Sequence, residues 1–374
     1  MGKPPPLLNF SYMNIALNLP LNRLSFGQMS TMILKTLFDK EMAGEKHNIF
    51  LFPIGNTDLA SQLNNESFNS WLREKMNNAE ESYSRDIPIF KLWHLNGSME
   101  SLSRYQTLLT FYEVDEPTKV ELNIAKNNKI LFSSNYSRSI FSAFGVETGY
   151  LPLAFDSYNF KVIQKKLHSD SRITFNLCGK LEKRKNHEKV IQTWIKKFGG
   201  DYRYSLQCAV YNPFLGEEQN KQAIFNILKS SKPFNVNFFP LMAENSVYNE
   251  FLNSAEIIIG MSSGEGWGLP EFQSVALGKH SVILDAHGYK GWANCKNSVL
   301  VNPTGKEPCF DGQFFQKGQK FNQGNGFTWD EDEFIAACET AIQRVEASKV
   351  NENGLSLQKD FSKENFINNI ISKL

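Results

Sequence analysis

A chain of 374 residues is longer than one hydrophobic core usually supports, so we expect two domains. Its 40 Lys and Arg residues nearly balance 39 Asp and Glu residues, which gives no overall electrostatic drive toward nucleic acid or an anionic membrane. The 5 cysteines lack C-x-x-C spacing, which argues against a disulfide framework or a zinc site and favours a reducing, cytoplasmic compartment. No run of about 18 apolar residues is present, so we expect a soluble protein without a transmembrane segment and leave peripheral membrane contact open.

Apolar and amphipathic segments alternate along the first half of the chain, a pattern typical of parallel sheets with crossover helices. Strands are predicted at 14–19, 48–53, 87–93, 108–112 and 129–133. Helices are predicted at 28–40, 67–76, 117–125 and 136–144. A short strand and a loop over 149–158 end this half. No G-x-G-x-x-G motif follows the first strand, so a dinucleotide-binding fingerprint is not supported.

The second half continues the alternation. Strands are predicted at 173–177, 204–210, 236–239, 257–259, 280–285 and 298–301. Helices are predicted at 186–198, 217–228, 246–254, 329–345 and 363–374. Residues 303–325 are expected to form a long surface excursion, and loops of that length inside a compact domain are usually functional or mobile.

We therefore predict an α/β protein of two Rossmann-like domains, each with a doubly wound parallel sheet, facing a central cleft. The N-terminal domain is expected to span 1–155 and the C-terminal domain 156–350. Residues 351–374 are expected to end in a helix that packs back on the N-terminal domain. Because ligands bind beyond the carboxyl ends of strands in such sheets, the site should lie in the cleft.

The most informative stretch reads as strand, glycine-rich turn, helix and strand. A run of three isoleucines ending at Ile259 suits a strand covered on both faces. Gly264, Gly266 and Gly268 permit turns and close backbone approach, while Pro270 has the fixed φ of a first helical residue. The free amides and positive dipole end of that helix favour an anionic ligand such as a diphosphate. A glycine-rich turn without a ligand, as in many α/β proteins, is the alternative.

A basic run lies between the predicted strand at 173–177 and the next predicted helix. It consists of Lys180, Lys183, Arg184, Lys185 and Lys189. Cations normally favour the C-terminal end of a helix, so a cluster before a helix N-terminus indicates an anion nearby. We expect a diphosphate held between Lys180, Lys185 and the amides near 266–269. A solvated charged turn is the alternative.

Three segments, 179–188, 263–278 and 280–283, together resemble the nucleotide-sugar domain of retaining family-four glycosyltransferases. That family has the two-Rossmann-domain GT-B fold. The first half of this chain is similar to it only in layout. The resemblance implies a hexosyltransferase that moves a hexose from a nucleotide diphosphate sugar to an acceptor with retention of anomeric configuration, the first domain lying on the acceptor side.

In that family an E-x7-E motif places one Glu on the donor sugar and a second on the ribose of the nucleotide. Glu265 matches the first. The second position is Gln273, which carries no charge and accepts only through its amide oxygen. The family's paired basic residues correspond to Lys180 and Lys185; the first is more often Arg, and Lys keeps the charge but loses the bidentate fork. Glu271 lies two residues before Gln273 and is expected to point to another helix face in a structural role.

The resemblance implies further donor contacts, chiefly through the backbone. In the glycine-rich turn and the helix start they are Gly266, Trp267, Gly268 and Leu269. Outside it they are Gly27 in the first loop of the chain and, for the base, Phe239 and Leu241. In the first domain many members of the family place a histidine near the end of a mid-domain strand. The matching region here offers Glu113, and His94 is the other candidate; for either one, a structural or solvated role is the alternative.

The resemblance further implies front-face substitution, in which the leaving diphosphate helps deprotonate the acceptor. No D-x-D sequence stands at a predicted strand end, so we expect no metal, and no cofactor besides the nucleotide sugar as donor substrate. The acceptor stays open: a glycan, a lipid, a protein or a small molecule. A nucleotide-sugar-binding protein without transfer activity is one alternative, motivated by Gln273, and another GT-B enzyme, such as a phosphorylase or an epimerase, is a second.

Overall fold

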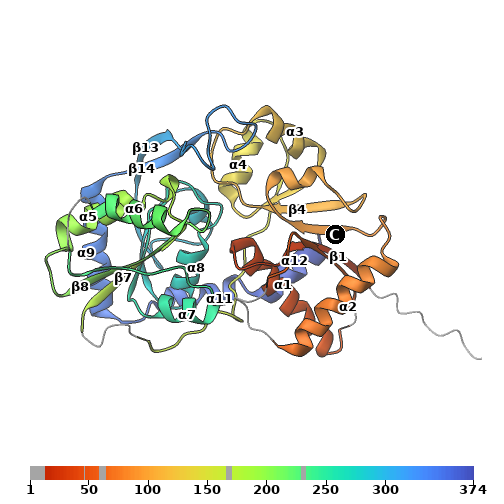
Figure 1. Ribbon diagram of the computed structural model, residues 1–374, viewed down its shortest axis with the longest axis horizontal. Helices are drawn as coiled ribbons and strands as arrows, with labels where there is room; N and C mark the ends of the chain where they lie inside the picture. Colours follow the sequence, from red (N-terminus) through yellow and green to blue (C-terminus); the bar gives the residue numbers. More distant parts are fainter. Residues whose placement is uncertain (1–12, 46, 59–64, 166–170, 229–232) are drawn as a thin grey trace, which may run out of the picture.

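The computed structural model describes residues 13–45, 47–58, 65–165, 171–228 and 233–374. The chain forms two parallel six-stranded sheets, one from each half, with helices packed around them (Figure 1). This architecture confirms the predicted α/β class with two doubly wound sheets. In the part of the chain that the structure describes, every helix is too short or too polar to cross a membrane.

The first sheet has the strand order β2-β1-β3-β4-β5-β6, with every pair parallel. Its strands are β1 (Met13–Pro20), β2 (His47–Ile54), β3 (Ile89–Leu92), β4 (Gln106–Thr110), β5 (Lys129–Phe132) and β6 (Gly149–Tyr150). Its helices are α1 (Ser25–Met42), α2 (Glu66–Ser82), η1 (Leu95–Met99), α3 (Lys119–Asn127) and α4 (Asn135–Ala143). The chain reverses its direction of travel through the sheet between β1 and β3, which is the switch point where such sheets bind ligands.

The second sheet has the order β12-β11-β10-β7-β8-β9, again parallel throughout. Its strands are β7 (Ile173–Gly179), β8 (Tyr204–Val210), β9 (Val236–Phe238), β10 (Ile257–Gly260), β11 (His280–Leu284) and β12 (Val299–Val301). Its helices are η2 (Lys183–Lys185), α5 (His187–Phe198), α6 (Glu217–Leu228), α7 (Asn245–Asn253), α8 (Leu269–Ala276), η3 (His287–Gly291) and α9 (Glu331–Ala347). Here the switch point lies between β7 and β10.

The end of the chain returns to the first half. Helices α10 (Glu352–Leu355) and α11 (Leu357–Asp360) pack near α8, and α12 (Lys363–Ile371) packs on α1. The backbone amide of Phe155 donates to the carbonyl of Phe361, at 2.9 Å. Phe361 also packs edge-on against Trp267 and Phe272, with ring centroids 5.4 and 5.5 Å apart. The C-terminal segment therefore ties the two halves together.

Residues 303–329, which we call the strap, have more regular structure than the sequence indicated. Their ends pair as an antiparallel hairpin of β13 (Pro303–Pro308) and β14 (Asn325–Trp329), joined by a loop over 309–324. Alternating polar and apolar residues are few here, so the hairpin carries little periodic signal. The strap leaves the second half and reaches across to α3 and α4 of the first (Figure 1).

Candidate active site

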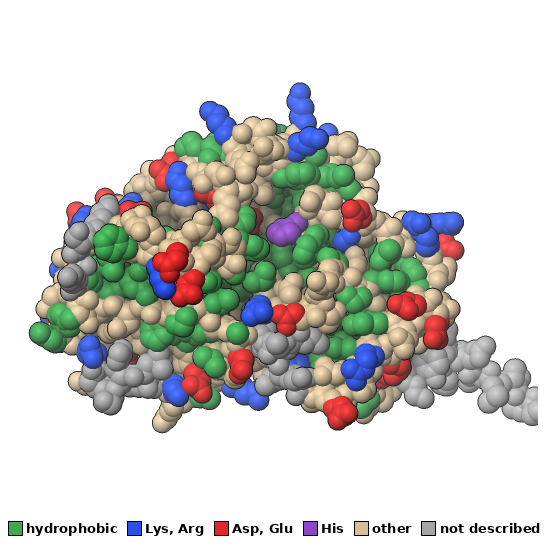
Figure 2. All heavy atoms as spheres, in the orientation of Figure 1, with side chains coloured by type: hydrophobic (Ala, Val, Ile, Leu, Met, Phe, Trp, Pro, Cys, Tyr) green, Lys and Arg blue, Asp and Glu red, His purple; other side chains and the backbone are tan. Residues whose placement is uncertain are grey.

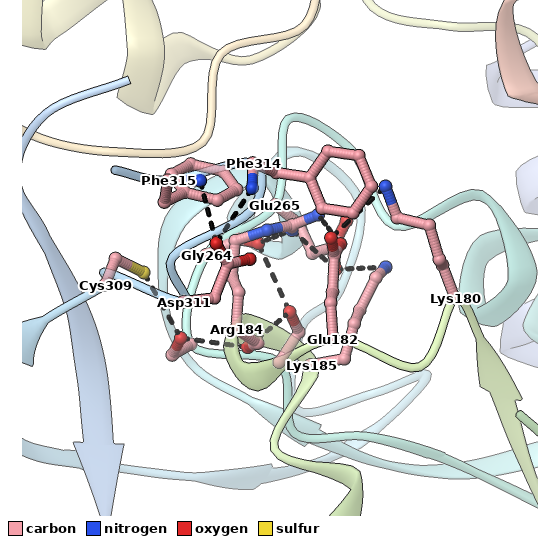
Figure 3. Close-up of polar contacts among 12 residues, drawn as sticks. Lys180, Glu182, Arg184, Lys185, Gly264, Glu265, Cys309, Asp311, Phe314 and Phe315 are labelled. Atoms are coloured by element: carbon pink, nitrogen blue, oxygen red, sulfur yellow. Dashed lines mark hydrogen bonds and ion pairs between the residues drawn. The ribbon is translucent and has the colours of Figure 1, made fainter. Parts of the chain in front are cut away.

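Two charged side chains meet at the switch point of the second sheet. Lys185 follows β7 and Glu265 follows β10, and their Nζ and Oε1 atoms form an ion pair. Their side chains are only 10% and 9% exposed. The adjacent parallel strands end at the same edge, so residues 80 positions apart become neighbours. Two residues that the sequence assigned to one site are therefore brought together (Figure 3).

Arg184 is the residue that the sequence interpretation underrated. Its guanidinium lies 3.2 Å from Oε1 of Glu265, donates to Oε1 of Glu182 at 2.6 Å, and donates to the carbonyl of Gly264. Its own carbonyl accepts the amide of Ser263 at 2.8 Å. The side chain of Arg184 is only 7% exposed, so it is not part of a solvated turn. It links the loop after β7 to the loop after β10.

The network fixes the charge states of its members. Burial raises the pKa of Glu265, but Lys185 and Arg184 outweigh burial and hold that pKa well below its usual range. Burial lowers the pKa of Lys185, but the charges of Glu265 and Glu271 and the hydrogen bond to Glu265 together raise it above its usual value. Both groups are therefore charged at neutral pH. Arg184 and Lys185, two of the cations before α5, are thus balanced by the chain's own carboxylates Glu182 and Glu265.

The glycine loop, residues 261–268, touches the first half of the chain. Only Gly268, with φ of 82°, needs the left-handed conformation. A Cβ at Gly264 would lie 2.6 Å from the carbonyl oxygen of Glu113, and one at Gly266 would lie 2.7 Å from Cβ of Phe111. The hydroxyl of Ser133 also donates to the carbonyl of Gly266 at 2.9 Å. Two of the three glycines thus permit close approach of the other half.

Glu271, which the sequence places on another helix face than Gln273, has a buried side chain whose charge Lys185 and Glu265 both influence. An added Cβ at Gly260 would lie 2.8 Å from Cγ of Glu271 and 3.2 Å from the Tyr289 hydroxyl. Because Gly260 has no side chain, Glu271 and Tyr289 can both pack against its backbone. Burial raises the pKa of Glu271 to about 7, with Lys185 opposing the shift.

Gln273 is 1% exposed, and neither atom of its side-chain amide has a hydrogen-bond partner among the residues that the structure describes. A buried amide without partners costs free energy unless another group binds it. Lys180, by contrast, is 29% exposed and stands apart from the Lys185–Glu265 pair. Its Nζ lies 3.2 Å from Oε2 of Glu182 and 3.7 Å from the ring centroid of Phe314, a strap residue.

The facing edge of the first sheet is aromatic. Phe26 stacks on Phe111, with centroids 4.3 Å apart, and meets His94 edge-on at 4.9 Å and Trp93 at 5.8 Å. We call these four residues the aromatic wall. They follow β1, β3 and β4, so they lie at the switch point of the first sheet. In the space-filling view, hydrophobic side chains surround an exposed His side chain near the middle of this face (Figure 2).

Both acid–base candidates of the first half lie near the charged network. His94 is solvent-accessible but has protein around it, and this burial, together with Lys180, lowers its pKa. Glu113 is half-buried; burial raises its pKa, while Arg184 lowers it. His94 is therefore neutral at pH 7. The two candidates feel different cations of the basic run: the charge of Lys180 acts on His94, and those of Arg184 and Lys185 act on Glu113.

The remaining predicted donor contacts differ in how exposed their side chains are. Side chains of Trp267 and Leu269 are 2% and 8% exposed and belong to the core, so only their backbone faces could meet a ligand. Gly27 is required by the chain itself, because a Cβ there would lie 2.0 Å from the carbonyl oxygen of Asn22. Phe239 packs on Phe251 with centroids 5.2 Å apart, whereas Leu241 is 43% exposed.

Two buried histidines hold the loops in place and were not singled out in the sequence. His187 donates from Nε2 to the carbonyl of Cys178 at 3.2 Å, and His287 donates from Nε2 to the carbonyl of Ser262 at 2.8 Å. Burial lowers their pKa values to about 3 and about 4. Within the described ranges, no three His, Cys, Asp or Glu side chains are arranged as metal ligands.

Neither a protein-family model nor a curated protein sequence matches this chain. Solved structures do. A glycosyltransferase from Rickettsia africae superposes with a TM-score of 0.66 at 11% identity, covering 97% of this chain and 98% of that one. Sucrose-phosphate synthase from Thermosynechococcus elongatus gives 0.64 at 13% identity, covering 96% and 97%. Anabaena HepE, solved with UDP and glucose, gives 0.61 at 14% identity, covering 96% and 99%. At such identities the likeness concerns the fold, and the chain has the two-domain GT-B fold.

Proposed function

We propose that this protein is a glycosyltransferase that moves a hexose from a nucleotide diphosphate sugar to an acceptor with retention of anomeric configuration. The observation that carries the proposal is the buried group of Arg184, Lys185 and Glu265 at the switch point of the second sheet, next to the N-terminus of α8. HepE, which has the same fold, was solved with UDP and glucose, and this makes UDP-sugars the first donors to test.

Each part of the donor has a suitable partner in this site. The diphosphate is dianionic or more, and Lys185, Lys180 and the free amides at the start of α8 supply positive charge and hydrogen-bond donors. Glu265 is ionised and can accept hydroxyl hydrogen bonds from the sugar. The unpartnered amide of Gln273 can do the same for the ribose.

The reaction that fits this charge distribution is a front-face substitution. The bond from the sugar's anomeric carbon to the phosphate oxygen breaks as the acceptor oxygen forms its bond on the same face, and the acceptor proton passes to the leaving phosphate. Cations preorganised at the diphosphate stabilise the charge that develops there, and one such donor is typically worth about 3 kcal/mol. We propose that these cations serve in place of a metal, so EDTA should leave transfer unchanged.

The direct test is transfer and hydrolysis of UDP-glucose and other nucleotide sugars by wild type, Lys185→Met and Glu265→Gln. Both variants should lose transfer by a factor of about 100 or more while their thermal midpoints show that they are folded. Lys196→Ala is the matched control, because Lys196 forms an exposed ion pair with Glu331 far from the site. Unchanged turnover in either site variant would refute the assignment.

Donor identity can be sought first by thermal shift over a panel of nucleotide sugars. A ligand at 100 times its dissociation constant adds about 2.7 kcal/mol to the free energy of unfolding. Binding without transfer or hydrolysis across a broad acceptor panel would favour the alternative of a binding protein without transfer activity. Activity with inorganic phosphate, or turnover without any acceptor, would favour a phosphorylase or an epimerase of the same fold.

A further inference from the structure

The strap covers the charged network from above. Phe314 lies on Lys180, and the ring of Phe315 lies 5.6 Å from the guanidinium carbon of Arg184 (Figure 3). Lys183 donates to the carbonyl of Phe310 at 3.3 Å. These contacts place strap atoms against three cations of the basic run, of which Arg184 is buried, Lys180 is partly exposed and Lys183 is exposed.

The base of the strap is anchored on the glycine loop. The amide of Phe327 donates to the carbonyl of Ser263 at 2.8 Å. A Cβ at Gly326 would lie 2.4 Å from the Ser263 hydroxyl, so β14 passes directly against the loop. Cys309, itself a strap residue, is 4% exposed, and its Sγ faces the same hydroxyl at 3.8 Å. Any movement of the strap away from the glycine loop would expose this thiol.

The far side of the strap is latched to the first half of the chain. The carboxylate of Asp115 accepts from Nζ of Lys306 at 2.7 Å and from the amide and side chain of Asn325 at 2.7 and 3.2 Å. Glu121 accepts from the amide of Asn322 at 2.9 Å, and the hydroxyl of Thr118 donates to a strap carbonyl at 2.6 Å.

Aromatic strap residues fill the space behind this latch. Phe315 is buried against the first-half residues Leu95, Tyr112 and Val114, and Phe310, Phe314 and Phe321 pack on the same cluster. The strap thus bridges the two halves of the chain (Figure 1) and contacts the basic run through Phe310, Phe314 and Phe315.

We propose that the strap is a gate for the donor, latched by Asp115, which must lift from Lys180 and the glycine loop before a nucleotide diphosphate can bind. The proposal rests on the proposed function for the nature of the ligand, and on geometry alone for the latch. A diphosphate needs access to the ammonium of Lys180, which Phe314 of the strap covers on one side. Opening exchanges that contact for a contact with the donor, which then competes with Glu182 for the same ammonium.

The latch can be tested without any ligand, using Cys309 as a native reporter. We expect Asp115→Ala to raise the rate at which maleimide labels Cys309 by about tenfold or more, because it removes three hydrogen bonds to a charged group that hold the strap closed. Exposed Cys295 gives the reference rate, and buried Cys338 reports global unfolding. Asp201→Ala, which removes an exposed carboxylate paired with Arg203, is the matched control.

Lys306→Ala breaks the same latch from the strap side at a residue whose side chain is 39% exposed, so folding is not at risk. It should accelerate Cys309 labelling in the same direction by a smaller factor. Unchanged Cys309 labelling in both variants, or a rise shared equally by Cys338, would overturn the latch.

The gate is tested by stopped-flow association of UDP-glucose, or of the donor that the panel identifies. Asp115→Ala and Phe314→Ala should bind it several-fold faster than wild type and Asp201→Ala. Equal association rates despite faster Cys309 labelling would overturn the gate. If no nucleotide sugar bound to wild type or to either variant while the labelling difference persisted, the proposed function would be wrong and the latch would stand.

Discussion

The switch points of the two sheets differ in chemistry. At the second sheet Arg184, Lys185 and Glu265 form a buried, fully ionised group. At the first sheet the aromatic wall presents stacked rings, with a histidine whose pKa is lowered. Both sites use the same βα geometry, so the fold does not decide their chemistry.

The difference indicates that the two switch points suit different ligands. Buried charges persist only where each one is paired, which makes the second sheet suited to a charged ligand that can replace one partner by another. The aromatic wall contributes area and shape with little charge, and aromatic faces bind sugar rings or apolar groups. We therefore assign the donor to the second sheet and the acceptor to the first, as part of the proposed function.

The largest effect should come from breaking the ion pair. Glu265→Ala leaves the buried Lys185 ammonium without this carboxylate partner and should lower the free energy of unfolding by about 3–5 kcal/mol in urea titrations. Lys185→Ala should cost less, because Arg184 still faces Glu265. The double variant Lys185→Ala with Glu265→Ala should be destabilised by much less than the sum of the single variants. Additive losses would mean that the two side chains are not coupled as the structure shows.

The acid–base candidates can be separated by substitution. If a proton relay operates, Glu113→Gln or His94→Gln should lower kcat by about 100-fold, or about 2.7 kcal/mol, for the residue that takes part, and should have little effect for the other. The pH profile of kcat is the second readout. Full activity in both variants would mean that the leaving phosphate is the only group that accepts the acceptor's proton. The first half of the chain would then serve for binding only.

Closure of the two halves can be tested at Gly264. Its substitution by Ala would bring a Cβ within 2.6 Å of the Glu113 carbonyl, so the halves must separate or the loop must shift, at about 1–3 kcal/mol. We expect lower activity and a larger radius of gyration in solution scattering. Gly200→Ala is the matched control, since an added Cβ there meets nothing within 4 Å. An unchanged radius with unchanged activity would contradict closure at this contact.

Glu271 should give a pH dependence of stability. Its folded pKa of about 7 lies above the ordinary value of 4.5, so its contribution is fully present below about pH 4.5 and is lost as the pH rises toward 7. The loss is of the order of 1.4 kcal/mol for each unit of the shift. Glu271→Gln should flatten this dependence in urea titrations at pH 5, 6, 7 and 8. If the free energy of unfolding of the variant changed with pH as in wild type, another group would be responsible for the dependence.

Much of the fold was predictable from the chain alone. The alternation of apolar strands with amphipathic helices predicted both sheets. A strand covered on both faces is apolar throughout, whereas a helix covered on one face repeats its apolar residues with the helical period, so each can be recognised locally. The chain position of Lys185 and Glu265 was predictable for the same reason: each follows a recognisable strand, and parallel strands end at one edge. The hairpin of the strap was missed, since its pairing depends on residues about 20 positions apart with no periodic pattern.

The sequence by itself determined the class of fold, the glycine loop before α8 and the presence of cations at the end of β7. Tertiary structure decided which of those cations faces inward. The short turn of η2 and the left-handed Asn186, with φ of 57°, turn Arg184 and Lys185 toward Glu265 and leave Lys180 to the strap. It also decided that Glu271 is buried beside Lys185 and that Gly264 and Gly266 meet the other half. Such outcomes depend on which surfaces approach from distant parts of the chain, and residue type does not encode that approach locally.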